Sequence, residues 1–159
     1  MFKKISTFCS QSLLRQLLFG GTVILSAYSW VLFRFFKRFA RFGIPSKTGN
    51  FLSKKPNSAR LADIRWAIAT VAKYVPWQNV CRHQAYQAKL LCDFYNIEYQ
   101  IFVGFKKGET NQIQGHAWTM AEGLMLSGFC NPEEYVVVQV FFRPKLLTLH
   151  ALLLHLKTT

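Results

Sequence analysis

The longest apolar stretch of the chain lies near its N-terminus, where Gln16–Phe33 contains no charged residue. Its length is close to the lower limit of about 17–25 residues for a membrane-spanning helix. The stretch ends in large side chains rather than a small-residue cleavage site, which argues against a signal peptide. A second interpretation is one or two helices with an apolar face, continuing as a basic amphipathic stretch through Arg34–Phe42. We favour helices that lie on a membrane or pack against the rest of the chain over a true span.

A polar segment follows this apolar region. Pro45 and the residues Ser46–Asn57, which include Gly49 and Pro56, are typical of a linker. We therefore predict an apolar, basic helical segment with its linker at residues 1–57 and a folded domain at residues 58–159. The second part has about the length of a typical domain.

Two helices are predicted at the start of the second part. Ser58 can cap the first helix, whose apolar positions recur at steps of three and four residues and stop before a proline. These positions are Leu61, Ile64, Ile68, Val71 and Val75. The second helix begins around Asn79 or Val80 and is stopped by Asn96. Cys81 therefore lies in its first turn.

After the second helix the pattern changes from helical to extended. Four runs rich in β-branched and aromatic residues are predicted as strands: Ile97–Phe105, His116–Glu122, Leu124–Phe129 and Tyr135–Phe142. A polar loop, Lys106–Gly115, separates the first two, and the leucines of the tail Pro144–Lys157 recur at helical steps typical of ordinary packing. Two helices followed by a small antiparallel sheet predict an α+β fold.

The chain is strongly basic, with 20 Lys and Arg against 7 Asp and Glu and a formal net charge of +13. Such a surplus favours a polyanion, an anionic membrane surface or an acidic partner. Part of it follows the apolar stretch, at Arg34, Lys37, Arg38 and Arg41, which suits lipid headgroups. No nucleic-acid-binding motif accompanies these residues, so we expect no nucleic-acid partner.

The four cysteines are far apart and form no metal-type pair: Cys9, Cys81, Cys92 and Cys130. This spacing predicts neither a zinc site nor a disulfide scaffold, and we expect no metal and no cofactor. The simplest interpretation is a reduced, cytoplasmic protein, with membrane association open through residues 13–42.

Cys81 and His116 are the best candidates for nucleophile and base. A helix N-terminus stabilises a thiolate through its unpaired N–H groups and the helix dipole, and Cys81 has that position. His116 opens a predicted strand, whereas His83 points to another side of the Cys81 helix, and the two histidines of the tail have the wrong spacing for a shared metal face. Cys92 is three helical turns from Cys81 and is best explained as a small apolar filler.

Four sequence elements resemble those of one known family. They are Trp77–Ala85, Phe102–Phe105, Gly115–Trp118 and Leu126–Phe129. In this order and spacing they resemble the transglutaminase-like cysteine peptidases that remove the leader from lasso-peptide precursors, over roughly residues 60–142. The apolar, basic N-terminal region is similar to that of the small stand-alone members.

The resemblance implies a transglutaminase/papain-like core and a peptidase mechanism. Cys81 would attack the carbonyl at the end of the leader, and His116 would protonate the departing amine and then activate water. The freed core amine would pass to an asparagine-synthetase-like cyclase. Because nothing in the sequence resembles a leader-binding module, a separate leader-binding protein would deliver the precursor peptide.

The chain departs from the family at one position, where Gly128 occupies the place of the orienting Asp. The imidazole would then be oriented by Ser127, by Asn131 or by a backbone carbonyl. Gln78 is a candidate oxyanion donor, together with the N–H groups at the start of the Cys81 helix.

Trp77 and Trp118 are candidates to line the substrate cleft, although tryptophans at such positions more often form core walls. Two other functions stay open on the sequence alone. One is a non-catalytic membrane-surface or assembly protein, favoured by the basic apolar N-terminus and the missing carboxylate. The other is an acyl or amide transferase that uses the same Cys–His pair.

Overall fold

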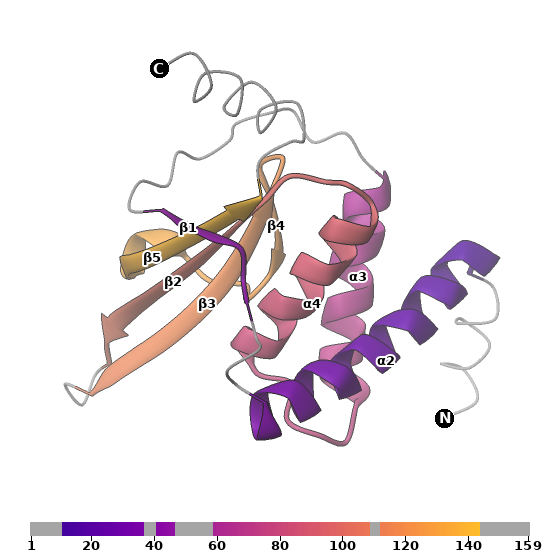
Figure 1. Cartoon of the computed structure of the whole chain (residues 1–159), viewed down its shortest axis with the longest axis horizontal. Coiled ribbons are helices and arrows are strands. Elements are labelled where there is room, and N and C mark those ends of the chain that lie inside the picture. Colours follow the sequence, from indigo (N-terminus) through magenta and orange to yellow (C-terminus); the bar gives the residue numbers. More distant parts are fainter. Residues whose placement is uncertain (1–10, 37–40, 47–58, 109–111, 144–159) are drawn as a thin grey trace, which may run out of the picture.

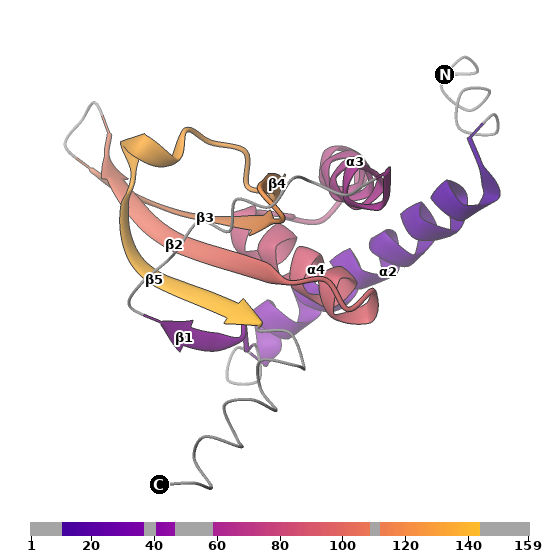
Figure 2. The same ribbon diagram turned by 90° about the horizontal axis from the view of Figure 1, so that it is seen from above.

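Three helices and a five-stranded sheet form three layers. The structure, a computed structural model, describes residues 11–36, 41–46, 59–108 and 112–143. The helices are α2 (Leu13–Phe35), α3 (Ala59–Tyr74) and α4 (Cys81–Phe94). Helices α3 and α4 pack against the sheet, and α2 lies across their other side (Figures 1 and 2).

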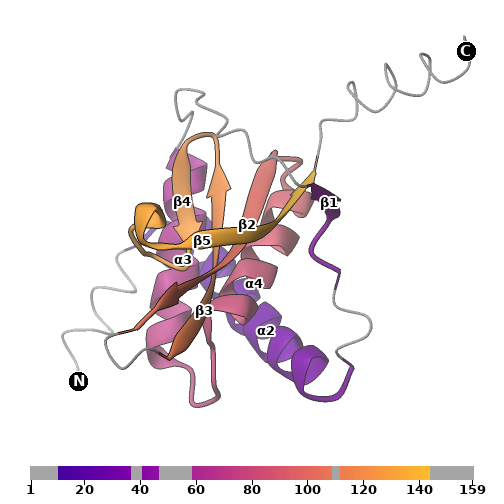
Figure 3. The ribbon, with the colours of Figure 1, turned by 90° about the vertical axis from the view of Figure 1, so that its left-hand side faces the viewer.

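The sheet is antiparallel, with the strand order β1-β5-β2-β3-β4. Its strands are β1 (Ile44–Ser46), β2 (Tyr99–Lys107), β3 (Ile113–Ala121), β4 (Leu124–Ser127) and β5 (Val136–Arg143). A short 3-10 helix, η2 (Pro132–Glu134), precedes β5. Figure 3 views the molecule from the side of the strands, with the helices behind them. The predicted α+β class, with helices on a small antiparallel sheet and a long apolar N-terminal helix, is confirmed.

The core lies between the sheet and the helices α3 and α4. Its buried apolar residues include Leu61, Ile64, Ile68, Ala85, Ala88, Leu91, Cys92, Ile101 and Leu126. The first three belong to the predicted apolar stripe of the α3 segment. Cys92 is buried in this cluster, in agreement with its interpretation as an apolar filler.

Two predicted boundaries are wrong. The loop expected at Lys106–Gly115 is shorter, because Lys107 pairs with Ile113 and extends the β2–β3 hairpin. Pro45, expected to begin a linker, lies instead in β1 and pairs with Phe141 of β5. Pro is tolerated on an edge strand such as β1, where its missing N–H costs no ladder bond.

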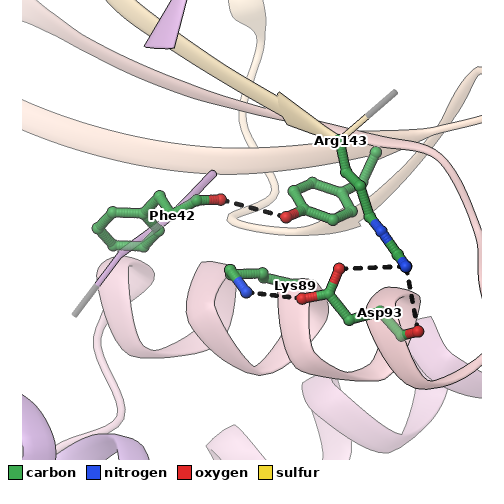
Figure 4. Close-up of polar contacts among 5 residues, drawn as sticks. Phe42, Lys89, Asp93 and Arg143 are labelled. Atoms are coloured by element: carbon green, nitrogen blue, oxygen red, sulfur yellow. Dashed lines mark hydrogen bonds and ion pairs between the residues drawn. The ribbon is translucent and has the colours of Figure 1, made fainter. Parts of the chain in front are cut away.

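The domain boundary predicted at residues 57 and 58 lies outside the described residues, as does the predicted tail helix. The segment before that boundary contacts the part that follows it. The Tyr99 hydroxyl donates a hydrogen bond to the carbonyl of Phe42 at 3.3 Å. Asp93, near the end of α4, pairs with Lys89 at 2.6 Å and with Arg143 of β5 at 3.3 Å (Figure 4).

Candidate active site

Cys81 is the first residue of α4 and is half-buried. The N-cap residue, Val80, makes no side-chain capping hydrogen bond, so no side chain of the N-cap competes for the first N–H groups of the helix. Such groups can stabilise a thiolate or an oxyanion. One side of Cys81 packs against the apolar core between α4 and the sheet.

His116 lies in β3, the strand against which α4 packs, and its side chain is half-buried. Its Nε2 atom is 3.0 Å from the carbonyl oxygen of Gly128. Because a carbonyl oxygen can only accept, Nε2 carries a proton in this contact, and Nδ1 is the basic nitrogen of the neutral ring. The ring is also packed against Tyr135, with 5.3 Å between ring centroids.

Gly128 occupies the position at which the resembling family has its Asp, and the backbone there excludes a side chain. Its φ is +67°, in the left-handed region, and a Cβ atom would lie 2.2 Å from the carbonyl oxygen of Ala117. The main chain can therefore approach His116 closely at this point. The Gly128 carbonyl contacts the imidazole at the position where the resemblance implies an orienting carboxylate.

A second half-buried cysteine follows Gly128 by two residues. Cys130 is half-buried, and burial raises the pKa of its thiol above the usual value. The negative charges of Glu134 and Cys81 also raise this pKa, and the positive charge of Lys106 lowers it. Of the two predicted catalytic side chains, the segment 128–130 contacts His116, through the Gly128 carbonyl. The described hydrogen bonds do not include one between Cys81 and His116, so the pair itself stays a prediction.

The other candidate orienting residues have different partners. The Ser127 hydroxyl donates to Thr119 Oγ1 at 3.1 Å, and Asn131 Oδ1 accepts from the backbone N–H of Glu133 and caps η2. Of the three groups considered from the sequence, the backbone carbonyl is the one for which the structure gives a bond to His116. Gln78 is exposed, and its backbone carbonyl oxygen is 2.9 Å from Nδ1 of His83.

The two tryptophans differ in exposure. Trp118 is fully buried and stacks on Phe102 with 5.4 Å between ring centroids, so in this conformation it is part of the core. Trp77 is half-buried. Within the described part of the chain, the indole N–H groups of both are buried without a hydrogen-bond partner. Their place along a substrate cleft stays a prediction.

Several neighbours of His116 were not anticipated from the sequence. Tyr135 packs on the imidazole, and the Lys106 ammonium lies 5.0 Å from the centre of the Tyr135 ring. Lys106 also pairs with Glu134 at 2.7 Å, which lowers the pKa of that carboxyl. These contacts depend on the pairing of β2 with β5 and have no local signal. The described residues contain no group of three or more His, Cys, Asp or Glu suited to a metal ion.

Comparison with known proteins identifies the family. A family profile described as the transglutaminase-like superfamily matches residues 27–140, more than half of the chain. The matched region begins in α2, ends in β5 and includes both Cys81 and His116. Searches of curated proteins and of solved structures gave no match. The chain belongs to the transglutaminase-like superfamily.

Proposed function

We propose that the chain is a cysteine peptidase that removes the leader from a ribosomally made lasso-peptide precursor. In this proposal Cys81 is the nucleophile and His116 the base. The observation that carries it is the bond between His116 Nε2 and the Gly128 carbonyl, which leaves Nδ1 as the basic nitrogen. Cys81 is the first residue of α4, which packs against β3, the strand of His116.

The chemistry follows from these two groups. Proton transfer from Cys81 to Nδ1 of His116 yields a thiolate, which attacks the carbonyl carbon at the end of the leader. As the C–N bond breaks, His116 returns the proton to the departing core amine, leaving a thioester on Cys81. Water, deprotonated by His116, then hydrolyses the thioester and releases the leader acid. Backbone N–H groups at the head of α4 are suited to bind the oxyanion.

The proposed reaction sequence includes two partner proteins. A separate leader-binding protein would deliver the precursor peptide, and an asparagine-synthetase-like cyclase would use the freed amine. The purified full chain should therefore release the leader from a lasso precursor, detected by mass spectrometry, and release it faster when the leader-binding protein is present. Absence of release in both mixtures would contradict the proposal.

Cysteine variants test which thiol is the nucleophile, with Cys92→Ala and Cys130→Ala as controls for Cys81→Ala. Cys81→Ala should abolish leader release, whereas Cys92→Ala, which changes a thiol buried in the core, should retain it. Cys130→Ala tests the other half-buried thiol. Burial raises the pKa of Cys130, which disfavours its reactive thiolate, so its variant should also retain activity. Loss of release in Cys130→Ala, with release retained in Cys81→Ala, would show that Cys130 and not Cys81 is the nucleophile.

A further inference from the structure

The helix α2 buries three small polar side chains and exposes several large apolar ones, unlike a typical helix of a water-soluble protein. Its buried positions include Thr22, Ser26 and Ser29, each fully buried. Their hydroxyls bond to carbonyls of the preceding turn of the same helix, at 2.7 to 3.0 Å. Small side chains of this kind allow close approach of neighbouring helices. Leu32 and Phe33 are also buried, but several other large apolar residues of α2 are left on the outside.

The outward residues form a continuous apolar stripe, here called the outer face of α2. They recur at alternating steps of four and three residues, as one side of a helix requires. They are Leu17, Gly21, Ile24, Tyr28, Val31 and Phe35, and all are exposed. Ile24, at the middle of the helix, has 71% of its surface exposed. Soluble helices normally bury such a stripe, so the outer face indicates an apolar environment.

The charges next to the outer face are basic. Among the exposed residues of α2 the only charged one is Arg34, in the last turn. Arg41 is exposed a few residues further on. Arg82 is exposed at the start of α4, with its guanidinium 5.5 Å from the centre of the Phe33 ring of α2. An apolar face flanked by arginines complements an anionic lipid surface.

The contacts of α2 with the rest of the molecule decide how it meets a bilayer. By length and composition it is the one described helix that could cross a membrane, a test that core helices and signal sequences also pass. Only 28% of its most apolar window is buried, however, so it is not a core helix. Near its N-terminus, Arg15 pairs with Asp63 of α3 at 2.6 Å. Near its C-terminal end, Ser29 accepts a hydrogen bond from Gln87 of α4 at 3.1 Å.

These contacts hold both ends of a helix roughly 34 Å long against the helix layer. A spanning α2 would have to leave that layer or carry α3 into the hydrocarbon, together with its exposed Arg60 and Arg65. We propose that α2 is an in-plane membrane helix that docks the folded domain on an anionic bilayer through its outer face. The proposal concerns location and does not depend on the chemistry of Cys81.

Vesicle flotation of the full chain tests this proposal. The protein should bind vesicles of equal parts phosphatidylcholine and phosphatidylglycerol, and bind pure phosphatidylcholine more weakly. Ile24→Glu should weaken binding about tenfold or more, because a charge replaces a large apolar side chain that enters the lipid. The matched control is Ile113→Glu, since Ile113 lies in β3 and is equally exposed, at 72%. Equal binding by the two variants would overturn the proposal.

Three further measurements separate other arrangements. Alkaline carbonate should release the full chain from membranes of cells that produce it, whereas retention would indicate a spanning helix and contradict in-plane docking. The two variants should unfold at the same temperature as the parent. A selective loss of stability in Ile24→Glu would mean that another segment of this chain covers the outer face. The parent protein could also form a dimer in the absence of lipid. If Ile24→Glu dissociated that dimer and the parent did not float with vesicles, the outer face would be the interface with a second copy of the chain.

Discussion

At the scale of single residues, Gly128 matters through its backbone. Its carbonyl holds the His116 ring, and its φ of +67° is a conformation that residues with a Cβ rarely adopt. The carbonyl can reach the imidazole because no side chain separates β4 from β3 at this point. At this position, a backbone carbonyl rather than a side-chain carboxylate contacts the imidazole.

We predict that Gly128→Ala destabilises the protein by more than the roughly 1–2 kcal/mol cost of a left-handed L-residue. The new Cβ would lie 2.2 Å from the Ala117 carbonyl oxygen, so β3 or β4 must also shift. Chemical denaturation measures the loss. Gly115→Ala in the same hairpin is the matched control, because its Cβ meets nothing within 4 Å. Equal stability of the two variants would refute the close approach at Gly128.

A second prediction compares the thiols of α4. Brief iodoacetamide treatment at neutral pH should alkylate Cys81 faster than a small-molecule thiol, and His116→Ala should slow that reaction. Cys92 should stay unmodified until the protein unfolds, because it is fully buried and burial raises its pKa to about 12. Peptide mapping by mass spectrometry gives both rates. A Cys81 rate that is unaffected by His116→Ala would argue against a Cys–His pair.

The sequence predicts the local positions of the candidate residues well and their neighbours poorly. Helical periodicity and a polar start place Cys81 at the head of a helix, and strand-like residues place His116 in a strand. Tyr135 reaches His116 only through the packing of distant elements. The Gly128 contact was anticipated only as one of three alternatives, because its carbonyl orientation depends on a turn that the side chains do not specify.

At the scale of secondary-structure elements, the α2–α4 interface contains an unusual buried amide. Gln87 of α4 is fully buried, and its Nε2 donates to Ser29 of α2 and to Asn79 Oδ1 at 3.1 and 2.8 Å. One side chain therefore joins α2 to the loop that precedes Cys81. Helix periodicity predicted the position of α4 but not this link, because a buried Gln on a helix face has no distinctive pattern.

We predict that Gln87→Leu lowers the free energy of unfolding by about 1–3 kcal/mol, since two buried hydrogen bonds are lost at about 0.5–1.5 kcal/mol each. Amide hydrogen exchange in α2 should accelerate as well. Gln84→Leu is the control, because the Gln84 side chain donates its hydrogen bond to the Asn79 carbonyl and not to α2. Unchanged α2 exchange in Gln87→Leu would show that the amide does not hold the helix in place.

The boundaries of an element could be predicted where its hydrophobic periodicity continues over many residues. They could not be predicted where strand pairing determines the end of the element. The α3 segment matches its predicted stripe closely. The strand β1 contains only three residues, one of them Pro45, and exists because β5 offers an edge for pairing. The β2–β3 hairpin extends into Lys107 and Ile113 for the same reason, since cross-strand hydrogen bonds stabilise residues whose sequence resembles a loop.

At the scale of the whole molecule, α2, α4 and the loop before Cys81 meet around His83. It faces α2 from α4, with 5.3 Å between its ring centre and that of Phe33, and its Nδ1 contacts the Gln78 carbonyl of the loop before Cys81. Its Nε2 is buried without a partner among the described residues. Burial lowers the pKa of His83, the positive charge of Arg82 lowers it further, and the bond to Gln78 opposes both.

This lowered pKa predicts the direction in which pH changes stability. Above the unfolded value of about 6.5 the imidazole is neutral in both states and has no effect. Below it, the unfolded chain binds a proton that the folded protein excludes, so unfolding becomes easier until the pH also falls below the folded pKa. The loss from this one group grows by at most about 1.4 kcal/mol per pH unit. Urea denaturation should therefore give a lower midpoint at pH near 5 than near 7.5 for the parent.

His83→Gln should reduce the difference between these two midpoints, because the substituted amide does not titrate. Arg82→Gln should reduce it less, since burial contributes more than Arg82 to the shift. Parallel pH profiles for the parent and His83→Gln would place the acid sensitivity at other groups. The His83 ring packs between α2 and the loop before Cys81. A confirmed effect would therefore mean that acid loosens two regions at once: the helix proposed to dock on lipid, and the loop that leads to the candidate nucleophile.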